Sequence, residues 1–398
     1  MHRLAAGGAP VSILFAGYEE ANLGCVAPVM AALARRGVTP LFLPGTDFKP
    51  HRGLRTATAP AGVAAPSPLV ALPASQRAAA RRHGVALLRR ARNWARHLPL
   101  SEQPAAAALR RLLEPPAMDA IAAAYAQLAA AAAEIARREP ARLVVLSEDS
   151  DYLRGRLLAR VFAAEGRRVV CLSPWYYAAF ASYPMVGRRR ADHYLVGSDA
   201  QARRLRAGGV AADAVTVVGH PELDAVASLP PAPPGGVLYA LQGLPWEAEI
   251  AADLVAWTRR RRDARLVIRA HPTLPRPAWL RRLGRGHGVV VAPAAANVSD
   301  LLAAAQCVVA QTSRMLWEAS LAGRSVVVPH YDATPLPIAV PAGDRRAVVA
   351  TSGAALQRRL DAALDGRGRG LARDVIAPHH PRATARATAA LLALLRAG

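Results

Sequence analysis

The feature that most constrains the fold is an alternation of short apolar runs with helical stretches, repeated on both sides of a proline-rich segment. In the first half, residues 11–43 read as a buried strand, a glycine-bounded loop, a helix ending at Gly37 and a second strand. A helix between two strands makes a parallel pair, since antiparallel strands need only a tight turn. Continuous apolar strands indicate a sheet covered on both faces. The sequence therefore predicts an α/β protein with parallel sheets.

The proline-rich segment is PPAPPGG at 230–236, and a fresh strand, VLYALQG, comes directly after it. Proline stiffens such a connector and the glycines let it turn, so we expect it to join two domains. A chain of 398 residues is also too long for one ordinary core. We predict two Rossmann-like domains that face each other across a central cleft. The expected bounds are 1–229 for the first domain, with an Arg/Ala-rich helical insertion at about 50–140, then 237–380 for the second domain and 381–398 for a C-terminal helix.

The composition limits the partners. The formal net charge is +23, but 51 Lys+Arg include a single lysine, Lys49, which is typical of a GC-rich coding bias. Aromatic residues make up only 5% and no basic-aromatic repeat occurs, so we do not expect nucleic-acid binding. The three cysteines are scattered without a CxxC pair, which indicates a reducing compartment. With no convincing signal peptide or spanning segment, we expect a cytoplasmic protein.

In open α/β sheets, ligands bind outside the carboxyl ends of the strands. Two such ends in the second half carry polar residues or glycine. Gln242 and Gly243 end the strand VLYALQG, where glycine permits close approach of a ligand; an ordinary turn is the alternative. Arg269 and His271 share one face at the end of RLVIRAHP, and Pro272 closes that strand. His271 can neutralise or protonate a leaving phosphate, or it simply packs there.

A third strand end lies in VVAQTSRMLWEASLAG. Thr312 and Ser313 occupy the expected N-cap position of a helix, where hydroxyls and N–H groups bind phosphate, and Arg314 comes next. Glu318 lies on that helix and is a candidate for the two hydroxyls of a ribose, as acidic residues are in dinucleotide folds. The alternative has Ser313 only capping and Glu318 on the surface. At the next strand end, we expect His330 and Asp332 to lie in a solvated loop.

In the first half, Glu19 and Glu20 follow the first strand and are candidates for a general base, unless they are loop charges. Asp149 and Asp151 match the metal-binding DxD of another transferase fold, but the two-halved layout argues against that fold. A Walker A sequence is absent. We expect neither a metal nor a cofactor.

Three segments resemble the GT-B glycosyltransferases and their relatives, the UDP-N-acetylglucosamine 2-epimerases. VTVVGHPELDAV at 215–226 is similar to the segment that leads these proteins into their second domain. RAHP resembles the His-Pro motif of bacterial capsule-type sialyl-, Kdo- and glycerophosphate transferases. QTSRMLWEASLAGRSVVVP at 311–329 is similar to the segment that holds the donor nucleotide. The likeness covers roughly 11–48 and 142–330, and the first loop lacks the glycine pair of many GT-B enzymes.

The resemblance implies that His271 binds or protonates the donor phosphate, that Thr312 and Ser313 bind phosphate, and that Glu318 binds ribose. It implies a metal-independent glycosyltransferase of surface or capsular polysaccharide assembly, with a CMP-, CDP- or UDP-linked sugar as co-substrate and a glycan or lipid-linked glycan as acceptor. Two alternatives stay open: a non-hydrolysing nucleotide-sugar 2-epimerase, and a non-catalytic nucleotide-sugar-binding protein. Epimerisation needs several acids and bases around the sugar, and the first half offers few.

The stretch 77–100 is a basic helical segment. Val85, Leu88 and the Ala91/Trp94 pair fall near one side of it, with arginines around them, although Gly84 is expected to interrupt the helix. An apolar strip with tryptophan and arginine is typical of a helix at a membrane surface. We therefore expect peripheral contact with the inner membrane face, unless the strip packs on the first domain.

Overall fold

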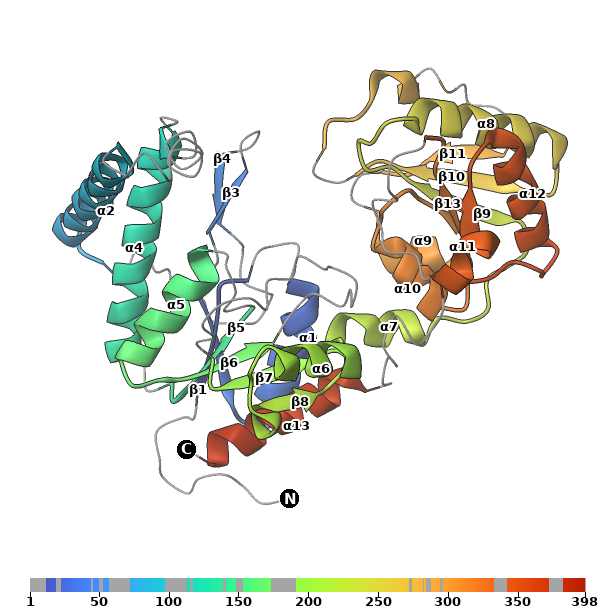
Figure 1. Cartoon of the computed structure of the whole chain (residues 1–398). Helices are drawn as coiled ribbons and strands as arrows, with labels where there is room; N and C mark the ends of the chain where they lie inside the picture. Colours follow the sequence, from blue (N-terminus) through green and yellow to red (C-terminus); the bar gives the residue numbers. More distant parts are fainter. Residues whose placement is uncertain are drawn as a thin grey trace.

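A computed structural model gives two lobes, each built on a six-stranded parallel sheet (Figure 1). The predicted α/β fold with two Rossmann-like domains is confirmed. The structure describes residues 12–18, 23–43, 46–49, 53–56, 72–96, 113–114, 117–138, 141–147, 153–172, 191–271, 274–281, 283, 288–293, 296–332, 342–371 and 382–397.

The first sheet has the strand order β2-β1-β5-β6-β7-β8, and all its described pairings are parallel. Its inner strand β1 is fully buried, because helices cover both faces and leave no polar side. The strands are β1 (Ser12–Ala16), β2 (Thr39–Leu43), β5 (Leu143–Leu146), β6 (Arg168–Leu172), β7 (His193–Val196) and β8 (Val215–Val217). The helices after them include α1 (Leu23–Ala34), α5 (Leu153–Ala164) and α6 (Asp199–Ala207). A separate antiparallel pair, β3 (Thr46–Lys49) and β4 (Gly53–Thr56), was not predicted.

The insertion of the first domain contains two long helices, α2 (Ala74–Arg96) and α4 (Ala117–Arg138), which pack side by side (Figure 1). The expected interruption at Gly84 is wrong, because α2 runs through it unbroken. Gly84 lies at the helix contact: a Cβ there would come 2.3 Å from the carbonyl oxygen of Ala122. Leu88 is buried on the same side, while Leu87 is 49% exposed. A mostly apolar groove of about 970 Å³ runs along the seam between the helices.

Replacing Gly84 by valine is expected to destabilise the protein by about 1–3 kcal/mol, the usual cost of overpacking, because the new side chain meets the backbone of α4. Chemical denaturation measures this loss. Ala86→Val is the matched control, since Ala86 is exposed on the same helix. Equal stability of the two variants would show that α2 and α4 separate at little cost.

The second sheet has the order β11-β10-β9-β12-β13-β14. Its strands are β9 (Gly236–Ala240), β10 (Arg265–Arg269), β11 (Val289–Val291), β12 (Cys307–Val309), β13 (Ser325–Pro329) and β14 (Val349–Ala350). The helices are α8 (Glu247–Arg260), α9 (Val298–Ala303), α10 (Met315–Leu321), α11 (Ala342–Val348) and α12 (Gly353–Leu364). Between β10 and β11 the described residues form only a short 3-10 turn, η5 (Ala278–Arg281), and α11, α12 and β14 were not predicted.

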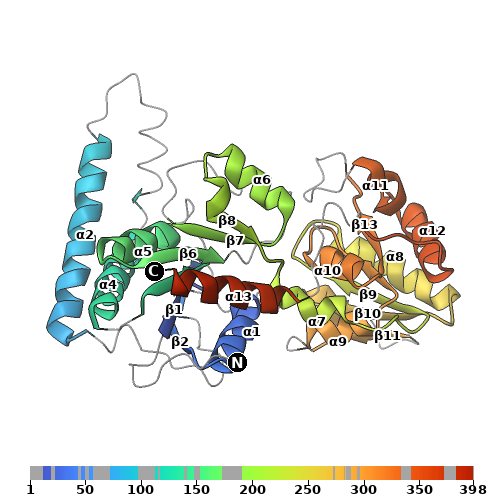
Figure 2. The same ribbon diagram turned by 90° about the horizontal axis from the view of Figure 1, so that it is seen from below.

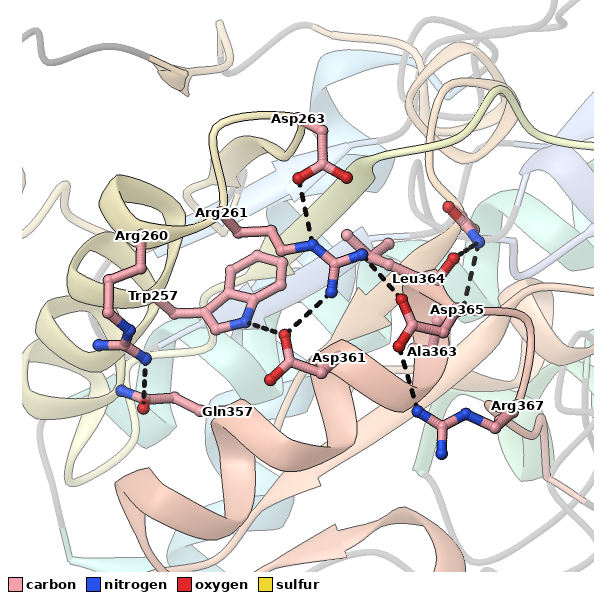
Figure 3. A network of polar contacts seen from close by, with 11 residues as sticks. Trp257, Arg260, Arg261, Asp263, Gln357, Asp361, Ala363, Leu364, Asp365 and Arg367 are labelled. Atoms are coloured by element: carbon pink, nitrogen blue, oxygen red, sulfur yellow. Dashed lines mark hydrogen bonds and ion pairs between the residues drawn. The ribbon is translucent and has the colours of Figure 1, made fainter.

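A polar network ties α8 to α12 on the outer face of the second domain (Figure 3). The buried Trp257 donates its indole N–H to Asp361, at 2.9 Å. Arg261 contacts Asp263, Asp361 and Asp365 at 2.8–3.2 Å. Because these bonds join helices about 100 residues apart in the chain, they hold the helical cover on the sheet.

The chain passes between the two domains twice. The outward path runs through η4 (Pro221–Leu223), α7 (Asp224–Ala227) and the proline-rich linker, whose Pro230 carbonyl accepts a bond from the buried Arg324. The return path ends in α13 (Ala383–Arg396), which lies beside α1 in the first domain (Figure 2). Asp224 accepts the N–H groups of Ala383 and Thr384, both at 2.9 Å, so the two crossings are fastened together.

No helix within the described ranges combines the length and the apolar character that crossing a membrane requires.

Candidate functional site

The candidate site lies where the carboxyl end of β8 in the first domain meets α10 of the second. The turn after β8 carries His220, Pro221 and Glu222 into η4, and α10 comes after the carboxyl end of β12. The next helix, α7, packs against α10. Side chains at this junction therefore come from both domains, at the strand ends where open α/β sheets bind their ligands.

Arg314 is the side chain that connects the two domains here. Its guanidinium lies 3.6 Å from Glu222 of the first domain and 3.3 Å from Glu318, one turn along on α10. The Arg314 side chain is 41% exposed, whereas those of Glu222 and Glu318 are 9% and 5% exposed. Two nearly buried carboxylates thus hold one accessible cation.

Glu222 was not among the residues that the sequence singled out. Burial raises its pKa to about 7; the charge of Arg314 lowers it and the carboxylate of Glu318 raises it. Its Oε1 atom is buried and has no hydrogen-bond partner among the described residues. No local pattern marks this glutamate, because its environment comes from a helix of the other domain.

Arg269 and His271 lie at the end of β10, as the sequence predicted. Arg269 is half-buried, its Nη1 lies 3.9 Å from the Met315 sulfur, and its Nε has no partner within the described part of the chain. Burial lowers the pKa of Arg269, Glu318 raises it, and Arg314 lowers it. Arg269 therefore interacts electrostatically with the carboxylate that Arg314 contacts, and we refer to Arg269, Arg314 and Glu318 as the arginine cluster. His271 is half-buried just beyond the strand.

Gln242 and Gly243 form a turn rather than an open cradle. Both backbone N–H groups donate to the buried carboxylate of Glu247. Gly243 has φ +71°, in the left-handed region. The side-chain oxygen of Gln242 accepts from the backbone N–H of Thr312 at 2.7 Å and from its hydroxyl at 3.0 Å. Gln242 thus positions the loop that carries Thr312. It can affect the site in this way without contacting a ligand itself.

The N-cap prediction for α10 needs correction. The N-cap residue is Arg314, which makes no side-chain cap, and Ser313 precedes it. The Ser313 hydroxyl accepts from the Met315 N–H at 3.2 Å, so it satisfies one free donor of the first turn. α10 begins later than expected because the loop turns through Ser313 and Arg314 before the helix starts.

The other predicted residues fall in two groups. Glu19, Glu20 and Pro272 lie outside the described residues, as does the segment 148–151. At the end of β13, His330 and Asp332 lie 3.6 Å apart, and Asp332 accepts from the indole of the exposed Trp246 at 3.2 Å. The loop after β13 therefore packs on the loop after β9 and is not simply solvated.

The turn that presents Glu222 is fixed by a close contact. The His220 ring is 2% exposed, and a Cβ on Gly197 would come 1.5 Å from its Nε2. Only glycine at position 197 leaves this space, so β7 and β8 together set the path of the turn.

Comparison with solved structures finds this fold along nearly the whole chain. A protein from Listeria monocytogenes, provisionally assigned as a UDP-N-acetylglucosamine 2-epimerase, matches with a TM-score of 0.60 and 14% identity, over 98% of each chain. The UDP-GlcNAc 2-epimerase from Methanocaldococcus jannaschii matches with a TM-score of 0.57 and 10% identity, over 96% of this chain and 99% of that one. The UDP-GlcNAc 2-epimerase from Neisseria meningitidis, solved with bound UDP-GlcNAc, matches with 0.55 and 11%, over 96% and 99%.

No protein-family model matches the sequence, and no curated protein matches it either. At these identities the structural matches show the fold, which is the two-domain, GT-B-like fold of nucleotide-sugar 2-epimerases.

Proposed function

We propose that the chain is a nucleotide-sugar-dependent enzyme that binds its donor at the Arg269–Arg314–Glu318 cluster and transfers the sugar to a glycan acceptor. The observation that carries this proposal is the contact of Arg314 with the buried Glu318 carboxylate at 3.3 Å, with Arg269 at the end of β10 close enough to interact electrostatically with the same carboxylate. Arginines match phosphate geometry, and a carboxylate accepts bonds from ribose hydroxyls.

Each residue then has a defined role. Arg314 and Arg269 neutralise the diphosphate, and the loop of Thr312 and Ser313 lies beside it, held by Gln242. His271 stabilises or protonates the leaving phosphate. Glu19 and Glu20 stay candidates for the general base. The charge that develops on the leaving group is met by protein cations, so the proposal includes no bound metal.

A second candidate is a nucleotide-sugar 2-epimerase. The structural neighbours named above are epimerases, and one of them binds UDP-GlcNAc, which favours this activity and a UDP-linked sugar. Against it, an epimerase must move a proton and break a bond within the sugar, which needs several acids and bases. The first half offers few such groups beyond Glu19, Glu20, Glu148 and Asp151. We therefore place sugar transfer first.

Binding of UDP is expected to raise the thermal stability of the protein more than CMP, CDP or GDP does. At a ligand concentration of 100 times Kd, the gain is about 2.7 kcal/mol.

Glu318→Ala is expected to weaken binding of the nucleotide by about 1–3 kcal/mol, the scale of a charge-assisted hydrogen bond. Titration with the ribonucleotide and its deoxy analogues measures this loss, and Glu249→Ala on the exposed face of α8 is the control.

If Glu318→Ala binds the ribonucleotide and its deoxy analogues as tightly as the wild type does, Glu318 does not bind the ribose. If no nucleotide changes the thermal stability, the proposed donor site is wrong. Incubation with a panel of nucleotide sugars separates the two activities, because only an epimerase changes the sugar without an acceptor.

Association of α2 with anionic membranes also stays a prediction. Arg81, Arg82, Arg89 and Arg90 are exposed on α2, which has no acidic residue, and each basic group near anionic lipid contributes about 1 kcal/mol. We expect co-sedimentation with anionic but not neutral vesicles at low salt, and less of it after Arg-to-Gln replacement at these four positions. Equal recovery in the supernatant with both lipids would leave α2 an ordinary surface helix.

A further inference from the structure

The contact between Glu222 and Arg314 lies outside the nucleotide roles described above. Arg314 belongs to the second domain and reaches across the junction to a carboxylate of the first. The same guanidinium is the exposed cation that the proposed function assigns to the phosphates. Glu222 and a bound phosphate therefore compete for one positive charge.

The surroundings of Glu222 leave it few other partners. It lies against the start of α1, where a Cβ on Gly24 would come 3.2 Å from its Oε2, so glycine makes room for the carboxylate. Glu222 interacts electrostatically with the Cys25 thiol of α1 and with Arg314 and Glu318 of α10, and α13, which also packs against η4, carries Arg386. Burial raises the pKa of Cys25, and Glu222 raises it further, so this thiol stays neutral. Asp224, two residues along, bonds to α13 instead.

Phosphate binding would change the balance of charge around Glu222. Arg314 already contacts the carboxyl groups of Glu222 and Glu318, and a diphosphate brings further negative charge to the same guanidinium. The nearly buried Glu222 then loses the attraction that offsets its burial and gains a negative neighbour. Both changes favour the protonated acid.

Building on the proposed function, we propose that Glu222 is a positioning residue that holds Arg314 in the empty protein and takes up one proton from solvent when the phosphates of a nucleotide sugar bind Arg314. The carboxylate becomes a neutral carboxylic acid, and no other bond is made or broken. Donor binding is thereby coupled to the contact between the two domains.

The coupling has a defined pH range. Because the pKa of Glu222 in the empty protein is about 7, the carboxylate is mostly ionised above this pH and proton uptake on binding is then large. Below about pH 6 the group already carries its proton, so binding takes up little.

Calorimetric titration with UDP-N-acetylglucosamine tests the proposal. Both phosphates of this probe are esterified, so neither titrates near pH 7. The observed heat, measured in Pipes, Hepes and Tris at pH 7.5, gives the protons taken up from its slope against the ionisation heat of the buffer. We expect a slope of up to about three quarters of a proton for the wild type at pH 7.5, the ionised fraction of a carboxyl group with a pKa of about 7, and a slope near zero at pH 5.5. Glu222→Gln is expected to bind with a slope near zero at both pH values, while Asp224→Asn keeps the wild-type slope.

The outcomes separate the two proposals. Binding without proton uptake by the wild type, or uptake that persists in Glu222→Gln, overturns the role of Glu222 and leaves the donor site standing. Absence of binding by this probe and by CMP- and GDP-linked sugars removes both. If Glu222→Gln does not fold, proton uptake is measured on His271→Ala instead. Uptake that is retained in this variant supports Glu222 as the group that takes up the proton, and uptake that is lost assigns the proton to His271.

Discussion

Replacement of His271 by alanine is expected to lower the rate of sugar transfer by about 100-fold or more, the usual cost of losing a group that stabilises developing charge. The expectation rests on the position of His271 at the end of β10, two residues beyond Arg269, which belongs to the cluster around Glu318. The rate with a saturating donor measures it, and binding of the donor is expected to change much less.

His330→Ala is the matched control, because this histidine lies just after β13, which is separated from β10 by β9 and β12 in the same sheet, and it contacts Asp332. It is expected to keep most of the activity. A His271→Ala protein within about threefold of the wild-type rate would make His271 a packing residue.

Replacement of Glu222 by glutamine is expected to stabilise the protein at pH 8 by about 3 kcal/mol and to leave its stability at pH 4.5 nearly unchanged. The pKa of Glu222 is about 7 in the folded protein, whereas an unfolded glutamate titrates near ~4.3. Between these values the folded state holds the extra proton, so the contribution of Glu222 is full at low pH and is lost as the pH rises through 7. Glutamine resembles the protonated acid and does not undergo this loss.

Urea denaturation of the two proteins at pH 4.5 and pH 8 measures the difference. Glu249→Gln, which changes an exposed carboxylate on α8, is expected to show no such pH-dependent gain. If Glu222→Gln differs from the wild type by the same amount at both pH values, the carboxyl group does not titrate between them.

The sequence predicted the strands and their ends well, because each of these is set by local pattern. The strand predicted in RLVIRAHP is observed as β10, Arg265–Arg269, so His271 lies just beyond the end of the strand. The helix α12 was missed although its buried residues Leu356, Leu360 and Ala363 have helical spacing and Ser352 caps it, so the signal was present.

The chemistry of the junction could not be predicted in the same way. Glu222 stands in a segment that resembles the entry to the second domain, and its partner Arg314 lies 92 positions further along the chain. The burial that raises the pKa of Glu222 arises only when η4, α1 and α10 come together. Likewise, the loop that leads into α10 is held by a bond from the Thr312 N–H to Gln242, whose own N–H donates to Glu247 at the start of α8, and no local pattern marks these contacts.

The return of α13 to the first domain has a consequence for synthesis. Ala387, Leu391 and Leu392 belong to the same core as Ile13 and Phe15, yet the start of α13 is separated from its partner Asp224 by 159 residues. During translation, α1 can cover this face of the sheet early, but the core is completed only after the whole second domain has been made. A single proteolytic cut in the linker would also leave the two domains joined, because the other crossing still connects them.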